Sequence, residues 1–219
     1  MSAIFGIIYK DGKPAEQRVA DILHASISHR ATDGKGTWME ANVVLGHCLL
    51  KTYPQQEFEK QPQKQDSCII TADARLDNRS DLATWFGIDK QLLAITSDPV
   101  LILHAYQRWG KDCVKYLEGE FAFAIWDNLK KECFFARDRV GIRPLFYSEA
   151  NGTLVFGSEI KSLFEYTFTF PTLLVAETIN WTKHQKPVIL FLLTILESDE
   201  ESSALNSAFK FADFLYFKG

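Results

Sequence analysis

Residues 119–127 read GEFAFAIWD, and this stretch decides the fold. Phe121, Phe123 and Ile125 alternate with two alanines and a tryptophan, so an extended strand here would carry apolar side chains on both faces. A strand that is apolar on both faces lies inside a layered structure. Gly119 at its beginning suits a turn with positive φ. The stretch therefore predicts a central strand that is covered on both sides.

Apolar runs bounded by turn residues continue outward from this strand in both directions. They predict further short strands at residues 3–9, 43–50, 68–72, 133–137, 145–148 and 154–156. Helical spacing of apolar residues appears at 15–27 and 99–109, and Asp98 before Pro99 fits a helix N-cap followed by proline. This order of strands, helices and strands predicts an α+β domain with mostly antiparallel sheets.

The length and the net charge of the chain limit its number of domains and its expected partners. The chain has 219 residues, 47% of them hydrophobic, which allows one domain and an appendage. The net charge is −4, and acidic and basic residues are interspersed, so neither nucleic acid nor an anionic membrane is an expected partner. The apolar N-terminus is short and lacks a basic region, which indicates a strand and not a signal peptide. We expect a soluble, cytoplasmic protein.

The four cysteines give no sign of a metal site. Cys48, Cys68, Cys113 and Cys133 stand far apart, with no C-x-x-C pair and no histidine at ligand spacing. We therefore expect no bound metal and predict reduced, half-buried thiols.

Four stretches taken in order carry a family resemblance. They are SAIFGI at 2–7, SHRATDGKG at 28–36, GEFAFAIWD at 119–127, and ARDRVGIRPLFY at 136–147, the last followed by GSEIK at 157–161. Together they resemble the N-terminal glutaminase domain of asparagine synthetases, a class II glutamine amidotransferase with the N-terminal-nucleophile hydrolase fold.

The resemblance covers residues 1–164 and implies a four-layer αββα sandwich of antiparallel sheets. Within it, Arg137, Asp138 and Gly141 are interpreted as architecture. Residues 165–219 lose the rhythm of strands and glycines. We expect them to form a divergent tail with no assigned domain, as a truncated or frameshifted gene product would have.

The resemblance implies that Ser2 occupies the position of the nucleophile. The family uses a thiol exposed by methionine removal, and the α-amine of the same residue serves as its base. A hydroxyl is much less acidic than a thiol, so the chemistry is weakened. It is not excluded, because serine is the nucleophile in other hydrolases of this fold. The alternative reading is that Ser2 only begins a strand.

The substrate-binding positions implied by the resemblance have also changed. Cys48 aligns with the arginine that holds the glutamine carboxylate, and a thiol cannot form that two-pronged ion pair. Asp73, Ala74 and Arg75 align with the Asn-Gly-Glu of the oxyanion hole and amine site. An ionised Asp73 cannot donate to an oxyanion, and Arg75 would repel the substrate ammonium. Asp98 matches the second amine-binding acid, although its capping role alone would explain it.

These residues predict a degenerate glutaminase site that does not bind glutamine well. The Ser-Gly-Gly-x-Asp-Ser loop that holds ATP in full-length relatives is absent from the sequence, so we expect no cofactor. The leading hypothesis is a structural or partner-binding module for an ATP-dependent amide-forming synthetase. Its partner would be a separate synthetase subunit or a second copy of the chain. The pattern also resembles bacterial asparagine-synthetase-like proteins, some of which close lasso peptides.

A rival hypothesis keeps the chain among the enzymes. Ser2 would then be the nucleophile of an amidohydrolase that acts on an amide other than glutamine. This chemistry requires removal of Met1, because a retained methionine blocks the α-amine of Ser2.

Overall fold

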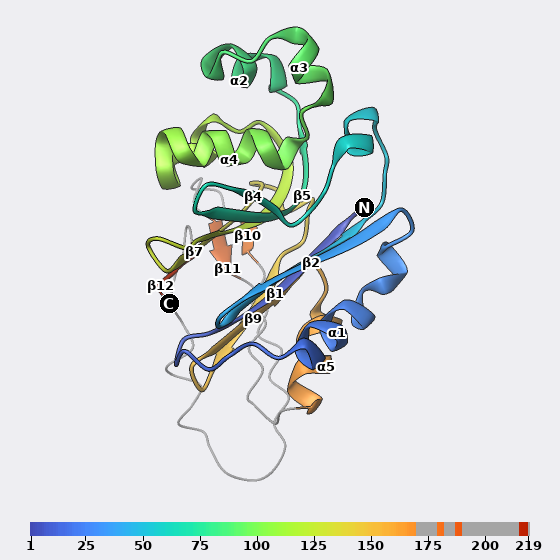
Figure 1. Ribbon diagram of the computed structural model, residues 1–219, viewed down its shortest axis with the longest axis vertical. Helices are drawn as coiled ribbons and strands as arrows, with labels where there is room; N and C mark the ends of the chain where they lie inside the picture. Colours follow the sequence, from blue (N-terminus) through green and yellow to red (C-terminus); the bar gives the residue numbers. More distant parts are fainter. Residues whose placement is uncertain (170–178, 182–186, 190–214, 219) are drawn as a thin grey trace.

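The computed structural model describes residues 1–169, 179–181, 187–189 and 215–218 (Figure 1). Most of the predicted tail, including the charged segment 197–203, lies outside these residues. Among the described helices, none combines the length and the apolar character needed to cross a membrane.

Two antiparallel sheets form the centre of the domain. Sheet A contains, in order across the sheet, β2 (Gly34–Glu40), β3 (Val43–Leu49), β1 (Ala3–Tyr9), β9 (Thr153–Gly157) and β8 (Phe146–Ala150). Sheet B contains, in order, β12 (Leu215–Lys218), β7 (Glu132–Arg137), β6 (Gly119–Asp127), β5 (Cys68–Leu76) and β4 (Gln63–Gln65). A separate ribbon pairs β10 (Ile179–Trp181) with β11 (Pro187–Ile189).

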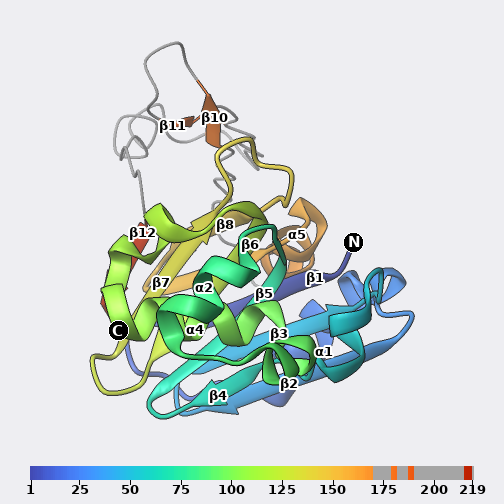
Figure 2. The ribbon, with the colours of Figure 1, turned by 90° about the horizontal axis from the view of Figure 1, so that it is seen from above.

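Helices cover the outer face of each sheet, as Figures 1 and 2 show. Sheet A is covered by α1 (Gln17–Ser26) and α5 (Ile160–Thr169), which also contact each other. On the side of sheet B lie α2 (Arg79–Phe86), α3 (Lys90–Ile95) and α4 (Asp98–Trp109). Three short 3-10 turns complete the described helices: η1 (Ser28–Arg30), η2 (Pro54–Phe58) and η3 (Gly110–Tyr116). The expected four-layer αββα arrangement is confirmed.

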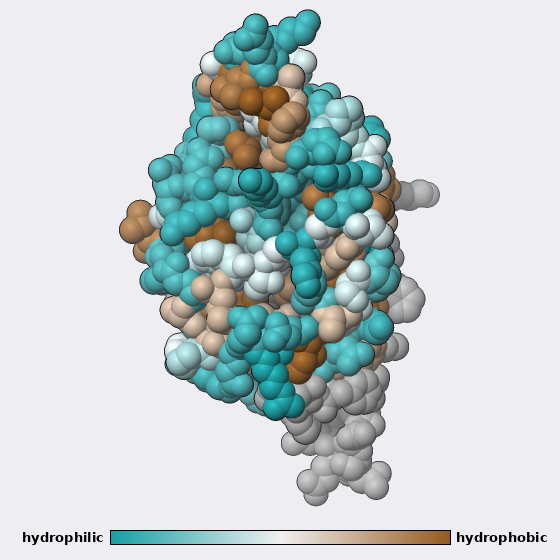
Figure 3. Space-filling view, turned by 45° about the vertical axis from the view of Figure 1, so that its right-hand side comes forward, coloured by the Kyte–Doolittle hydropathy of each residue, from teal (hydrophilic) through white to brown (hydrophobic). Residues whose placement is uncertain are grey.

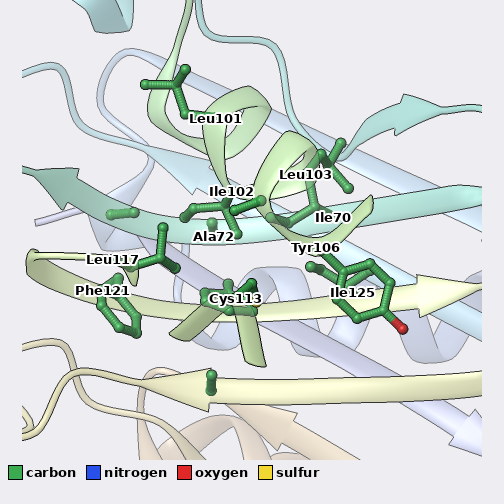
Figure 4. Close-up of a cluster of buried hydrophobic side chains, with 14 of the residues drawn as sticks. Ile70, Ala72, Leu101, Ile102, Leu103, Tyr106, Cys113, Leu117, Phe121 and Ile125 are labelled. Atoms are coloured by element: carbon green, nitrogen blue, oxygen red, sulfur yellow. The ribbon is translucent and has the colours of Figure 1, made fainter. Parts of the chain in front are cut away.

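The strand at residues 119–127 is buried on both faces, as its sequence predicts. Phe121, Phe123 and Ile125 pack toward α4 in one core (Figure 4), while Ala124 and Trp126 join the core between the two sheets. A third core joins α1 and α5 to sheet A. Each sheet thus buries two faces, which explains why its central strands are apolar throughout.

Two local predictions differ from the structure. Asp98 is the first residue of α4 and not its N-cap, a position that Ser97 takes, so Pro99 falls one residue further into the helix. The four cysteines are free but fully buried where we expected half-buried thiols.

The loop after β7 is built around one carboxylate. Asp138 accepts backbone N–H groups from Val140 at 3.1 Å, Ile142 at 3.0 Å and Arg143 at 3.0 Å. It also accepts the N–H of Phe121 on β6 at 3.4 Å. The interpretation of Asp138 as architecture agrees with these contacts, which fix the place of Arg143.

Candidate functional site

Ser2 lies immediately before β1, between the two sheets. Ser2 is only 1% exposed. Its Oγ accepts the backbone N–H of Leu50 at 3.1 Å and lies 3.4 Å from the carbonyl oxygen of Leu50. Side chains alternate along a strand, and Ile4 packs in the core between the sheets, so Ser2 faces sheet B. The predicted nucleophile is therefore buried and already hydrogen-bonded to the backbone.

Asp73 projects from β5 into the same region. It is 3% exposed, and its Oδ1 lies 3.3 Å from Nη1 of Arg143. Burial raises the pKa of Asp73 to about 6, an effect that Arg143 and the nearby N-terminal amine oppose. Asp73, which the resemblance aligns with a hydrogen-bond donor, thus carries a carboxylate that is mostly ionised at neutral pH.

Arg143 links Asp73 to a second acid. Its Nη2 lies 3.2 Å from Oε2 of Glu120, and its side chain is 9% exposed. Desolvated charges of this kind are stable only when each has a partner, so the three residues hold one another in place.

Asp98 is held by an ion pair of its own. Arg79 donates to its Oδ1, the backbone N–H of Leu76 donates to its Oδ2 at 2.9 Å, and the Tyr53 hydroxyl lies 3.3 Å from Oδ2. The guanidinium of Arg79 also donates to the carbonyl oxygens of Leu93 and Thr96. Asp98 therefore connects β5 and α2 to the start of α4. Both of its carboxylate oxygens already have partners within the protein, so neither is open to a substrate ammonium.

Cys48 does not lie with Ser2 and Asp73. Its side chain packs beneath α1 with Ala3 and Phe5, on the opposite face of sheet A, and burial raises the pKa of its thiol to about 11. Alternation along β3 puts the next residue, Leu49, on the face of Ser2. Leu49 is paired across the sheet with Gly34 and is also buried, so an apolar side chain faces the site here.

Ala74 and Arg75 flank the site without filling it. The Ala74 side chain is buried on the α4 side of β5, and its carbonyl oxygen accepts the Tyr53 hydroxyl. Arg75 is about half exposed and pairs with Asp77 at 2.8 Å. The Arg75 guanidinium is thus held at the rim of the site by a neighbouring acid.

A buried polar network lies beside Asp73. The Gln61 side chain forms two hydrogen bonds with the backbone of Ala72, at 2.6 and 2.7 Å, and its amide nitrogen also lies 2.6 Å from Oε1 of Glu59. His47 Nε2 lies 3.6 Å from the same oxygen. Burial lowers the pKa of His47 to about 3 and raises that of Glu59 to about 7, so this contact joins a neutral imidazole to a carboxyl that is easily protonated.

The polar groups of the site are engaged with partners inside the protein. A nucleophile must be free to attack, and donors must point at the developing oxyanion. Here the Ser2 hydroxyl is bonded to Leu50, Asp73 faces Arg143, and Asp98 faces Arg79. In the described part of the chain, no group of three histidine, cysteine or acidic residues could hold a metal ion.

The sequence named Ser2, Asp73 and Asp98 as candidate site residues but did not indicate the arginines that pair with the two acids. Arg143 stands inside the quoted stretch 136–147 and Arg79 lies just beyond the aligned Asp73-Ala74-Arg75. A usable signal was that each buried acid requires a cationic partner. Which arginine supplies it depends on the loop around Asp138 and on α2, and neither could be placed from the sequence.

Comparison with known proteins agrees with the fold. A family model described as a glutamine amidotransferase domain matches residues 1–186. Asparagine synthetase [glutamine-hydrolyzing] 3 of Bacillus subtilis is 36% identical over 152 residues, covering 68% of this chain and 25% of the relative. Amidase chyE of Penicillium rubens is 30% identical over 155 residues, covering 68% of this chain and 23% of the relative. The chain spans about a quarter of the length of these curated relatives.

A solved structure has the same architecture. The glutamine phosphoribosylpyrophosphate amidotransferase of B. subtilis, in complex with ADP and GMP, matches with a TM-score of 0.60 at 19% identity. The match covers 74% of this chain and 43% of that protein. At this identity the likeness concerns the fold alone, which is that of the N-terminal-nucleophile amidotransferases. With its family model matched over residues 1–186, this chain belongs to the glutamine amidotransferase domain family.

Proposed function

We propose that this chain is a glutamine amidotransferase domain of the asparagine synthetase type whose glutaminase site is inactive. Its role is structural or partner-binding, in support of an ATP-dependent amide-forming synthetase in the cytoplasm. The partner is a separate synthetase subunit or a second copy of the chain, and amide formation of the lasso-peptide type is one reaction such a synthetase performs. The chain itself holds no ATP.

One observation carries the proposal: the polar groups of the site have partners within the protein. Asp73 and Asp98 are paired with Arg143 and Arg79, so neither acid is open to a substrate. Leu49 lies on the face of Ser2, where binding of a substrate carboxylate would require a cation. Losing a single oxyanion donor typically costs on the order of a hundredfold in rate. Ser2, Asp73 and Leu49 together should reduce the rate far more than the loss of one donor.

The test is glutamate release from glutamine by the purified chain, with removal of Met1 confirmed by intact-protein mass. We expect no glutamate release from the natural protein and none from Ser2→Cys. A thiol alone restores neither a hydrogen-bond donor for the oxyanion nor a cation for the glutamine carboxylate. The triple variant Ser2→Cys, Asp73→Asn, Leu49→Arg places a thiol, an amide donor and a guanidinium on the face of the site and is the positive comparison. Release by the natural protein that disappears in Ser2→Ala contradicts the proposal.

An apolar patch on the surface supports the partner-binding role. Figure 3 shows hydrophobic surface at the upper end of the molecule, where α2 and α3 lie in Figure 1. Leu92 and Ile95 on α3 are 49% and 51% exposed, and η2, which contacts α3, carries Phe58 at 55% exposure. We call these three residues the α3 patch. Clustered apolar side chains at a surface are typical of interaction sites.

The partner-binding role is tested by pull-down against the asparagine-synthetase-type proteins of the source organism. Leu92→Asp combined with Ile95→Asp should abolish binding, since both charges would be buried in the interface. Leu129→Asp is the matched control, because Leu129 is 83% exposed in the turn between β6 and β7. A natural chain that retains none of these synthetases and stays monomeric contradicts the partner-binding role.

The amidohydrolase alternative rests on the buried hydroxyl of Ser2 and on relatives that include an amidase. It requires a free α-amine on Ser2. Retention of Met1 in the intact-protein mass therefore rules it out.

A further inference from the structure

The acids near Asp73 are only partly neutralised by Arg143. This arginine is shared between Asp73 and Glu120, so one guanidinium faces two carboxylates. Glu59 is a third acid in this region, and the charge of Asp73 adds to the burial that raises the pKa of Glu59 to about 7. Arg143 alone does not balance these charges, so the region can accommodate another cation.

Two further positive charges act on Asp73, the Arg30 guanidinium and the N-terminal amine. The Nε of Arg30 donates to Oε1 of Glu159, an oxygen that His29 also contacts at 3.1 Å. Arg30 is therefore engaged by an acid of its own. Of these two charges, the N-terminal amine is the candidate partner for Asp73.

Strands β3 and β5 advance together where the two sheets face each other. The Thr71 hydroxyl on β5 donates to the carbonyl oxygen of Gly46 on β3 at 2.9 Å. One residue further along both strands, Gln61 connects His47 to Ala72. Its amide nitrogen lies 3.2 Å from His47 Nε2 and 2.7 Å from the carbonyl oxygen of Ala72. The contacts thus move by one residue on each strand.

The next step along β5 places Asp73 level with the first residues of the chain. On β3 the same step reaches Cys48, which is paired across sheet A with Ala3. Ser2 comes directly before Ala3, and the side chains of Ser2 and Asp73 each point toward the opposite sheet, at 1% and 3% exposure. A chain that begins at Ser2 therefore has its terminal amine close to Asp73.

We propose that Asp73 is the counter-ion of the Ser2 α-ammonium in the chain from which Met1 has been removed. Removal moves the terminal charge from Met1, which is 45% exposed, to Ser2, which is 1% exposed. An ion buried to this extent is stable only with a partner of opposite charge. With the ammonium in place, it and Arg143 face the carboxylates of Asp73 and Glu120, and the charges of this group balance.

This ion pair deepens the proposed function, on which it rests, because it fixes the state of the amine. In the chemistry that the family resemblance implies, the α-amine accepts the proton of the nucleophile's own side chain. An ammonium held by Asp73 has no lone pair with which to accept that proton. Asp73 thus disables the base as well as the oxyanion site, which agrees with the silence expected of Ser2→Cys.

The pairing is tested by its effect on stability. Two forms of the full-length chain are prepared, one that begins at Ser2 and one that keeps Met1 because methionine aminopeptidase is inhibited during expression. Intact-protein mass confirms each form. Asp73→Asn is introduced into both, and urea denaturation gives the folding equilibrium constants. Glu120→Gln is the matched control, because it also removes an acid from Arg143.

We expect Asp73→Asn to lower the folding equilibrium constant at least about tenfold more in the chain that begins at Ser2 than in the chain that keeps Met1. Loss of the contact with Arg143 is common to both forms and cancels in this comparison. Glu120→Gln should have the same effect in both forms. Equal effects of Asp73→Asn in the two forms overturn the pairing, as does a natural protein that keeps Met1.

A crystal structure of the chain that begins at Ser2 is a second measurement, which needs no substitution and remains available if Asp73→Asn does not fold. The Ser2 nitrogen should lie within about 4 Å of a carboxylate oxygen of Asp73, the usual limit for an ion pair. A greater separation overturns the pairing.

The pairing and the proposed function fail in different measurements. Glutamate release by the natural chain overturns the inactive site, whatever the stability of the Asp73 variants. Absence of release together with equal effects of Asp73→Asn in the two forms keeps the inactive site and overturns the role of Asp73 as counter-ion. Absence of release together with the tenfold difference supports both.

Discussion

Gly36 on β2 has no room for a side chain. A Cβ built there would lie 1.9 Å from the carbonyl oxygen of Gln61, a backbone atom that cannot rotate away. Gly34, two residues earlier on the same face of the strand, would meet only the Leu49 side chain at 3.6 Å, which is ordinary contact. The first glycine is required for close packing, and the second is not.

We predict that Gly36→Ala lowers the free energy of unfolding by about 1–3 kcal/mol, because Gln61 must shift and break its bonds to Ala72. Gly34→Ala should change it by less than about 0.5 kcal/mol. Urea denaturation followed by circular dichroism measures both. Equal effects of the two substitutions would show that the contact with Gln61 is not the cause.

The carboxyl group of Glu59 makes stability depend on pH. Its pKa is about 7 in the folded protein against an ordinary value of 4.5, because burial disfavours the charged form. The folded state therefore binds the proton more tightly, and the contribution of Glu59 to stability falls as the pH rises from about 4.5 through 7.

Glu59→Gln keeps the oxygen that accepts from Gln61 but removes this titration. We expect the variant to be more stable than the natural protein by about 1–3 kcal/mol at pH 8, with little difference at pH 4.5. His47 titrates in both proteins and cancels in the comparison. A difference in unfolding free energy that is the same at both pH values would exclude Glu59 as its source.

At the scale of elements, the loop between β7 and β8 depends on Asp138. Its carboxylate accepts four backbone N–H groups and holds Arg143 against Asp73. Asp138→Ala should leave these donors without a partner and cost about 2–4 kcal/mol in unfolding free energy. Asp112→Ala, which removes only an exposed pair with Lys115, should cost less than about 0.5 kcal/mol. Thermal unfolding of both variants gives the comparison.

The elements that the sequence predicted are those with a strong apolar pattern. Residues 3–9 form β1 as predicted, and the helix predicted at 99–109 begins one residue earlier as α4. β2 and α3 were missed. Residues in these two elements are mostly half-buried or exposed, so no period of apolar residues marks them, and they form through pairing with β3 and capping by Asp89.

The site was predictable only in part, because the face on which a side chain lies depends on strand pairing as well as on local sequence. Ser2 and Asp73 could be found because the family motifs fix their place in the sequence. The face on which Cys48 lies depends on the register of β3 against β1, and a shift of one residue moves a side chain to the other face of the sheet. No local pattern determined that register.

At the scale of the whole molecule, the four cysteines report on unfolding. All are buried, and burial raises the pKa of each thiol, to about 12 for Cys113. We expect the folded protein to react with an aromatic disulfide reagent at least about a hundredfold more slowly than the same protein in urea. Leu129→Cys adds one exposed thiol as a control and should react at once. Rapid labelling of a native cysteine in the folded chain would contradict this burial.

β1 occupies the middle of sheet A, between β3 and β9. This strand thus has one neighbour at residues 43–49 and the other at residues 153–157. Until residue 157 has emerged, one edge of this apolar strand has no partner, and contacts so distant in sequence form slowly. During synthesis one edge of β1 therefore stays open to chaperones or to neighbouring chains until β9 has been made.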